Sequence, residues 1–406
     1  MKYLLVLSLF TAHSAYGALA GGRLNAFSVG ENAFAGVVNP ANAVWLKDRF
    51  DVGAFWVHQK SSLTNRDNNP FFPLGKTDLS YRARNLFTVD AAIHKQVNFD
   101  TFCASFSLAA YTLPSYTKVQ SKVPFPLSGT TPIYVSNRTD AISGIFSFKL
   151  NPAHSLGFSI DYYRFSHCRN GFQHSDNSSR SVSPGNVTNN GNDHSDGLGF
   201  SIGWRWKITE NLNFGTAWAR KSYCGQYRKY QGYEPHHAKN FAPQTLGAGF
   251  TYRFTPKFGG RLEVLWTNLG NLPSANNNLL PDGSLNMNKR GSDQSPGPGL
   301  NDATYINIGT GYLFTPMLSV GAGLSHRIRL PRKSPYIISH SYMLQTIYDS
   351  LSVAANFNYK KHNVFAGVIY GFKNTVSGLM PPTLGGGRFT GEKQSISLSL
   401  SWGYMY

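Results

Sequence analysis

The feature of this sequence that most restricts its fold is a long, strict alternation of apolar and polar residues. Near the C-terminus, every second residue from Ile396 to Tyr404 is large and apolar, and the residues between them are serine or glycine. The same kind of alternation occupies residues 155–162 and 197–208. Because side chains of a β-strand point to opposite faces in turn, we expect each segment to form a strand with one apolar and one polar face.

Fourteen segments of this character follow residue 48, and most of them are 10–13 residues long. Strands of soluble proteins usually have about 5–6 residues, whereas about 9–11 tilted residues cross a lipid bilayer. The length of the segments therefore favours a transmembrane barrel over a soluble sandwich. The expected strands lie at residues 50–58, 86–97, 101–112, 140–150, 153–166, 197–208, 211–223, 243–254, 258–268, 303–314, 317–327, 348–359, 363–373 and 394–405.

Short and long connections alternate between these segments. Tight turns on one side and long loops on the other are typical of outer-membrane barrels, and closure pairs every backbone group that would otherwise face lipid. We therefore predict an all-β fold, a 14-stranded antiparallel transmembrane β-barrel at residues 49–406, with apolar side chains toward lipid. The long polar loops are expected near residues 59–85, 113–139, 167–196, 224–242, 269–302, 328–347 and 374–393.

Composition agrees with this architecture and excludes others. Of the 406 residues, 14% are charged and 14% are aromatic, so the chain is not a disordered one. It contains no run of about 18 apolar residues, which excludes a helical membrane protein. The net charge is +18, and most basic residues fall in or beside the long loops. We expect them to meet the phosphates of lipopolysaccharide on the outer rim, and we expect no nucleic acid as a partner.

The first 48 residues do not alternate. Residues 1–20 have the pattern of a secretory signal peptide, with a positive charge at Lys2, an apolar stretch at residues 3–12 and small residues that permit cleavage after Gly17 or Ala20. Residues 21–48 are rich in glycine and alanine and moderately apolar. A segment trailing in the periplasm would be more charged, so we expect residues 21–48 to form a plug inside the lumen.

The start of the mature chain resembles the FadL family. The resemblance lies in the Gly/Ala-rich segment, in Asn39-Pro40-Ala41 and in residues 50–54, and it continues in residues 243–268, 302–314 and 320–324. That family comprises outer-membrane transporters of long-chain fatty acids and other hydrophobic compounds. The resemblance implies an N-terminal hatch that Asn39, Pro40 and Ala41 help to hold in the lumen. It also implies uptake of a hydrophobic molecule that leaves sideways through the barrel wall, and we expect this uptake to be passive because the sequence has no nucleotide-binding or energy-coupling motif.

Basic residues near the lumen are the candidates for binding a ligand carboxylate. Strand parity turns a set of charged residues inward, although a hydrated or ion-paired lumen would use them equally well: Asp90, Asp161, Arg205, Lys207, Arg253, Arg261 and Glu263. In the FadL family, basic residues meet the carboxylate inside an apolar pocket. The resemblance puts Arg169 at one such position and Lys289 or Arg290 at a second. The resulting candidates are Arg169, Lys289, Arg290, Arg205 and Arg253.

Two apolar runs in the long loops are candidates for first contact with a hydrophobic ligand, or alternatively with lipid A chains. Their residues are Phe71, Phe72, Leu74, Phe125 and Leu127.

The sequence shows no enzyme, metal or cofactor motif: no HExxH, GxSxG or P-loop occurs. Three cysteines are present, and spacing alone does not decide whether Cys168 and Cys224 pair. We expect a monomer that the barrel assembly machinery inserts into the bacterial outer membrane. A general diffusion porin and a surface adhesin or structural barrel stay open as alternatives to a transporter.

Overall fold

The computed structural model describes residues 26–66, 78–80, 84–100, 102–113, 117–124, 128–271, 286–296, 302–328, 349–379 and 387–406. The predicted signal peptide at residues 1–20 lies outside these ranges. So do the five candidates for ligand capture: Phe71, Phe72, Leu74, Phe125 and Leu127.

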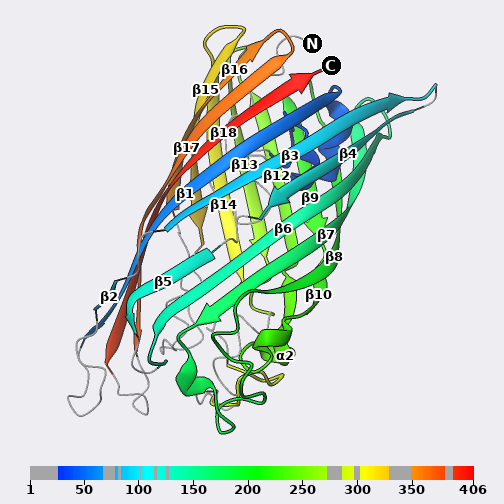
Figure 1. The fold of residues 1–406 in the computed structure, drawn as a ribbon. Helices are drawn as coiled ribbons and strands as arrows, with labels where there is room; N and C mark the ends of the chain where they lie inside the picture. Colours follow the sequence, from blue (N-terminus) through cyan, green and yellow to red (C-terminus); the bar gives the residue numbers. More distant parts are fainter. Residues whose placement is uncertain are drawn as a thin grey trace.

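Within the described residues, fourteen long strands close into an antiparallel barrel, as the alternation predicts (Figure 1). The ladder between β1 and β18 closes the ring and runs from Arg49↔Met405 to Arg66↔Arg388. The barrel strands are β1 (Arg49–Arg66), β3 (Arg84–Asn98), β4 (Cys103–Thr112), β6 (Pro132–Lys149), β7 (His154–Asn170), β8 (Asp193–Lys207), β9 (Leu212–Ala219), β12 (Thr245–Arg253), β13 (Phe258–Thr267), β14 (Ala303–Leu313), β15 (Leu318–Arg327), β16 (Asp349–Tyr359), β17 (His362–Leu379) and β18 (Arg388–Met405).

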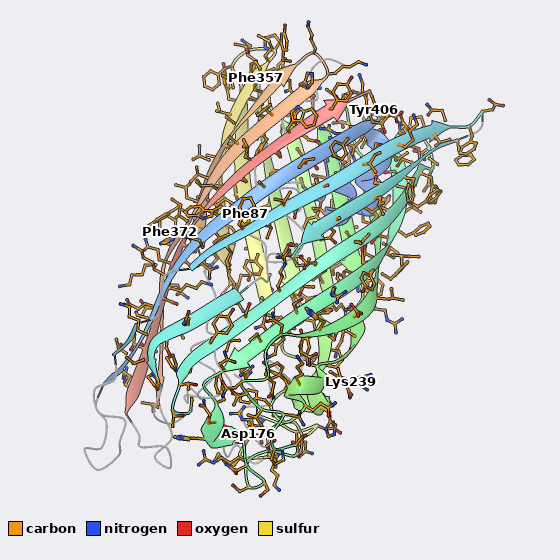
Figure 2. The ribbon with its side chains drawn as sticks, viewed as in Figure 1. Phe87, Asp176, Lys239, Phe357, Phe372 and Tyr406 are labelled. Atoms are coloured by element: carbon orange, nitrogen blue, oxygen red, sulfur yellow. The ribbon has the colours of Figure 1, made fainter. Side chains whose placement is uncertain are left out.

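The two ends of the barrel differ. The short-turn end carries the tight connections, such as residues 150–153 between β6 and β7, and the C-terminal Tyr406 (top of Figures 1 and 2). The long-loop end carries the long connections together with short additional elements. These are β2 (Asp78–Ser80), β5 (Thr117–Pro124), β10 (Ser222–Gln226), β11 (Lys239–Ala242), η4 (Gln173–Ser175), η5 (Arg228–Tyr230) and α2 (Pro235–Ala238).

Several strands extend further toward the long-loop end than the sequence pattern predicts. β1 continues to Arg66, β6 begins at Pro132, β17 continues to Leu379 and β18 begins at Arg388, although loops are expected at these four places. The ladder hydrogen bonds continue there, but both faces of these extensions carry polar residues. Alternation of hydropathy disappears outside the apolar band, so the predicted loop boundaries are wrong at these strand ends.

The wall has an apolar outer face and a polar inner face. Outward-facing side chains are highly exposed, for example Leu198 at 66% and Phe87 at 59%, whereas inward-facing Ser397 is 0% exposed. Figure 2 shows Phe87, Phe357 and Phe372 on the outer surface of the wall. Among the described residues, no helix is long and apolar enough to cross a membrane.

The N-terminal segment, residues 26–48, precedes the barrel and contains two short helices. These are α1 (Ala35–Val38) and the 3-10 helix η3 (Pro40–Trp45), drawn in dark blue near the short-turn end in Figure 1. η3 begins at Pro40 because proline has no N–H to leave unpaired at the first helical position. The side chain of Asn39 caps it by accepting a hydrogen bond from Ala41 N at 3.1 Å.

The wall is interrupted between β3 and β4. Their ladder runs from Asn98↔Cys103 to Ala91↔Ala110 and stops there. Beyond this point β3 pairs with β1, and the last residues of β4 pair with β6. One hydrogen bond crosses the interruption, from Thr112 N to Asp90 Oδ1 at 3.1 Å. In the described part of the chain, no ladder joins β3 to a following strand on the long-loop side of Ala91.

Candidate ligand path through the barrel

Asn39 ties the N-terminal segment to itself and to the barrel wall. Its side-chain amide donates to Phe27 O at 2.6 Å and to Trp204 O of β8 at 3.1 Å. The side chains of Asn39 and Ala41 and the ring of Pro40 are all buried. A buried amide whose donors and acceptor are all used fixes the segment in one position, because breaking any bond leaves a polar group unpaired.

A row of glycines in the wall receives this segment. An added Cβ at Gly203 of β8 would lie 1.9 Å from Asn39 Oδ1, and one at Gly157 of β7 would lie 2.4 Å from the carbonyl carbon of Pro40. At Gly215 of β9 the corresponding distance is 1.9 Å, to Phe27 O. The alternating glycines therefore leave space for backbone that packs directly on the inner wall.

Further contacts join the N-terminal segment to the strands. Val44 N donates to Ser147 Oγ of β6 at 2.8 Å, and Phe27 N donates to Glu263 Oε1 of β13 at 2.7 Å. Ala33 N donates at 2.8 Å to Asp51 Oδ2, which Arg49 also binds at 2.7 Å. The segment is thus hydrogen-bonded to β1, β6, β8 and β13.

Trp45, the last residue of η3, makes three separate contacts at the short-turn end. Its indole Nε1–H donates to Ser155 Oγ of β7 at 2.7 Å. The guanidinium carbon of Arg205 lies 4.7 Å from its ring centroid, and Lys149 Nζ lies 4.6 Å from the same centroid. Both distances are typical of cation–π interactions.

A cavity of about 80 Å³ lies on the long-loop side of these contacts. The N-terminal segment contributes Phe27, Val37 and Val38 to its lining, and Tyr111 at the end of β4 and Leu113 directly after it also line it. Apolar residues of β9 and β13 and residues 242–243 form much of the remaining lining, and β7, β8 and β12 add the polar side chains of Asp161, Tyr163, Ser201 and Thr245. The cavity therefore adjoins the place where β4 separates from β3.

Arg169 lies at the long-loop end and is completely buried. Its guanidinium forms an ion pair with Glu234, and its carbon lies 3.8 Å from the ring centroid of Tyr233 and 4.9 Å from that of Phe172. The guanidinium carbon of Arg290 also lies 4.9 Å from the centroid of Tyr233. We call this group the loop cluster. Its residues are Arg169, Phe172, Tyr230, Tyr233, Glu234 and Arg290.

The structure separates the five basic candidates into three places. It brings Arg169 and Arg290 together in the loop cluster, with the exposed Lys289 beside Arg290. Arg205 is 2% exposed and lies at Trp45, far along β8 from the long loops. Arg253 is half-buried at the short-turn end, where its Nε donates to Asn211 Oδ1 at 2.9 Å in the turn before β9.

Three residues of these sites carry no sequence signal. Trp45 stands in a segment without periodicity, and Tyr233 and Glu234 stand in a long polar loop. Each acquires its role only when strands distant in the sequence become neighbours. The open question about the cysteines is also answered by the fold, since Cys168 and Cys224 are both free thiols.

His167 borders the loop cluster and is 3% exposed. Its ring stacks on Tyr227 at 5.0 Å, meets Tyr230 edge-on at 4.7 Å and contacts Asn137 Oδ1 through Nδ1 at 2.5 Å. The exposed apolar residues of β7 end at Tyr162, so His167 lies beyond the apolar band. Burial lowers the pKa of His167 well below its usual value, and the nearby Arg169 adds to this effect.

Solved structures show the same architecture. The chain matches the Pseudomonas putida toluene transporter TodX with a TM-score of 0.66 and 13% identity, over 97% of this chain and 98% of that chain. It matches a Pseudomonas aeruginosa FadL homologue with a TM-score of 0.64 and 15% identity, over 99% of both chains. The chain has the FadL-type fold. The Ralstonia pickettii toluene transporter TbuX shares this FadL-type fold, with a TM-score of 0.62 and 10% identity over 96% and 98% of the two chains.

No family model matches the chain, and no curated protein matches it. The FadL-type barrels to which it is similar are described as transporters or channels rather than enzymes. The interior of this FadL-type barrel offers a mostly apolar cavity, an interrupted wall and buried cations at both ends. Such an interior can accept an apolar molecule and hold a negatively charged group, if the molecule carries one.

Proposed function

We propose that this chain is a bacterial outer-membrane channel for the passive uptake of hydrophobic molecules, and that long-chain fatty acids are among its substrates. In this proposal the N-terminal segment acts as a plug and the ligand leaves sideways through the wall between β3 and β4. The basic residues of the long loops pair with lipopolysaccharide phosphates, and this pairing anchors the long-loop end of the barrel in the outer leaflet.

One observation carries this proposal: the apolar cavity lies between the N-terminal segment and the interruption of the wall. Tyr111 at the end of β4 and Leu113 directly after it both line the cavity, at the place where the ladder between β4 and β3 has stopped. A strand edge without a ladder partner can separate from its neighbour without breaking a backbone ladder, here at the cost of the bond from Thr112 N to Asp90 Oδ1, so a ligand in the cavity has a short way into the lipid.

The small volume of the cavity indicates that part of its lining moves when a ligand binds. A protein cavity of about 150 Å³ holds one benzene molecule, and the present cavity of about 80 Å³ is smaller. A fatty acid therefore fits only when part of its lining moves. Phe27, Val37 and Val38 are the lining residues that come from the N-terminal segment. We therefore assign the movement to residues 26–48.

A second candidate substrate class is neutral aromatic hydrocarbons. The ion pair between Arg169 and Glu234 leaves the loop cluster with no uncompensated charge from Arg169 to attract a carboxylate. Two barrels with the same fold are described as toluene transporters. Radiolabelled oleate and toluene, offered separately to cells that express the chain, distinguish the two classes by which compound enters faster than in cells without it.

Deletion of residues 26–48 tests the channel itself. We expect the intact protein to raise oleate uptake and to conduct few ions in a planar bilayer, and the deletion to raise ion conductance strongly. High ion conductance before the deletion would instead identify a general diffusion porin. Failure of the intact protein to transport either oleate or toluene would contradict the proposal and favour an adhesin or a structural barrel.

A further inference from the structure

Arg205 differs from the buried Arg49, Arg169 and Arg261 by lacking an acidic partner. Its one hydrogen bond to a side chain goes from a terminal guanidinium nitrogen to Asn213 Oδ1 at 3.2 Å, and its Nε has no hydrogen-bond partner. No ion pair to Arg205 occurs in the described part of the chain. Arg169 pairs with Glu234, Arg49 with Asp51, and Arg261 lies 4.0 Å from Glu263. A buried cation without a counter-ion is strongly unfavourable, so its retention requires an explanation.

The ring of Trp45 covers this cation. The negative face of an indole compensates part of a positive charge, but less than a carboxylate does. Trp45 is also the last residue of η3, so it moves when the N-terminal segment moves. Anything that pairs better with Arg205 than the indole does therefore weakens a contact that holds this segment.

The geometry of β8 connects Arg205 with the cavity. Ser201 lines the cavity, and Ser201, Gly203 and Arg205 occupy successive inward positions on the same strand. Successive inward positions are about 7 Å apart. Gly203, between the other two, is covered by Asn39. The N-terminal segment thus lies between the cavity and Arg205, with Asn39 and Pro40 over Gly203, and a ligand in the cavity reaches the guanidinium only when this segment moves.

We infer that Arg205 is an anion receptor masked by Trp45, and that the carboxylate of an amphipathic ligand releases the N-terminal segment by replacing the indole. The inference rests on the proposed function, because it assigns to fatty acid uptake the step that opens the lumen. Ligand binding and release of the segment are then coupled: whatever loosens Trp45 raises the affinity of Arg205 for the carboxylate by the same factor.

The test compares oleate with oleyl alcohol, which has the same chain and no negative charge. Purified protein is placed in a planar bilayer, and the ion conductance is recorded as each compound is added, with protein-free bilayers as a blank. We expect oleate to open the channel at concentrations roughly tenfold lower than oleyl alcohol, the ratio that one charge-assisted hydrogen bond supplies. Equal responses to the two compounds would overturn the inference.

Three variants locate the effect. Arg205→Gln should remove the preference for oleate, whereas Lys257→Gln, which removes an exposed positive charge at the same end, should keep it. Trp45→Phe should lower the oleate concentration needed for opening, since phenylalanine is a weaker cation–π partner and has no N–H for Ser155. Trp45→Phe decides the case if Arg205→Gln proves permanently open. An unchanged oleate response in Trp45→Phe would overturn the inference.

The outcome also separates this inference from the proposed function. One outcome is that wild-type cells take up oleate while the conductance response is the same for oleate and oleyl alcohol. That result would support the proposed transport function and contradict the receptor role of Arg205. If cells take up neither oleate nor toluene, the proposed function itself falls.

Discussion

Two buried arginines at opposite ends of this barrel show how differently one residue type can be used. At the long-loop end, Arg169 is completely buried, ion-paired with Glu234 and stacked on Tyr233. At the short-turn end, Arg205 is equally buried but has only an amide oxygen and an indole ring as partners. The first charge is compensated within the protein, and the second is compensated only in part.

The difference teaches which cation is available to a ligand. Binding a carboxylate at Arg169 requires that it first displace Glu234, so the exchange of one carboxylate for another gains little. Binding a carboxylate at Arg205 replaces a weaker partner by a stronger one. Arg169 therefore holds loops together, whereas Arg205 is suited to a switchable contact. Substitutions in the surroundings of either arginine test this contrast.

The largest effect is expected from Glu234→Gln. This change leaves the buried Arg169 without its carboxylate, and breaking a buried ion pair by removing one partner costs about 3–5 kcal/mol. We expect the connection between β10 and β11 to open locally, since Tyr227 N and Ala238 N make their backbone hydrogen bonds there. Hydrogen exchange of residues 227–238 measures the loss of protection.

Glu392→Gln is the matched control for this change. Glu392 pairs with Lys373 at 2.8 Å, but both side chains are more than one-third exposed, so solvent screens the pair. Its removal should cost about 0–1 kcal/mol. Equal loss of protection in the two variants would mean that the Arg169 pair is no stronger than a surface pair. The claim that Glu234 compensates the charge of Arg169 more strongly than Trp45 compensates that of Arg205 would then be wrong.

The same contrast explains what could be predicted from the sequence. Strict alternation identifies all fourteen strands, because lipid on one side and a lumen on the other dictate side-chain polarity residue by residue. It also turns Arg205, Arg261 and Glu263 inward, as found. The partners of the arginines were not predictable: Glu234 is 65 residues from Arg169, and Trp45 is 160 residues from Arg205. Only closure of the barrel brings each pair together.

The wall glycines show a further limit of the sequence pattern. Gly157, Gly203 and Gly215 fit the alternation as small lumen-facing residues, which is correct but incomplete. Their absent side chains make space for Pro40, Asn39 and Phe27, and no local pattern reports which backbone will occupy that space. The seating of a non-periodic segment on a periodic wall is a property of the assembled barrel.

The next largest effect is expected from Gly203→Ala, which disturbs the N-terminal segment close to Arg205. The added Cβ would lie 1.9 Å from Asn39 Oδ1, so Asn39 must move and lose its bonds to Phe27 O and Trp204 O. Overpacking of this kind costs about 1–3 kcal/mol. We expect a partly displaced N-terminal segment and a higher ion conductance in planar bilayers.

Gly144→Ala controls for the loss of a wall glycine, since no atom lies within 4 Å of a Cβ added at Gly144. Its conductance should equal that of the wild type. If Gly203→Ala also conducts like the wild type, the N-terminal segment does not depend on close contact with the wall, and the coupling between Trp45 and Arg205 loses its structural basis.

The smallest effect is a pH dependence confined to the loop cluster. His167 is neutral in the folded cluster because its pKa lies well below the usual value, whereas in an opened cluster it takes up a proton near pH 6.5. The opened state therefore binds more protons, and the cluster loses stability as the pH falls below about 6.5, by at most about 1.4 kcal/mol per pH unit. Hydrogen exchange of residues 227–238 should accelerate between pH 6.5 and 5 beyond the intrinsic trend, and His167→Gln should remove the excess. Because Arg205 lies far from His167, Glu234→Gln, whose loops are loosened, should show the same oleate midpoint as the wild type at each pH over this range. A parallel shift of both readouts would show that the two ends act as one unit, and Arg169 and Arg205 could then no longer be assigned separate roles.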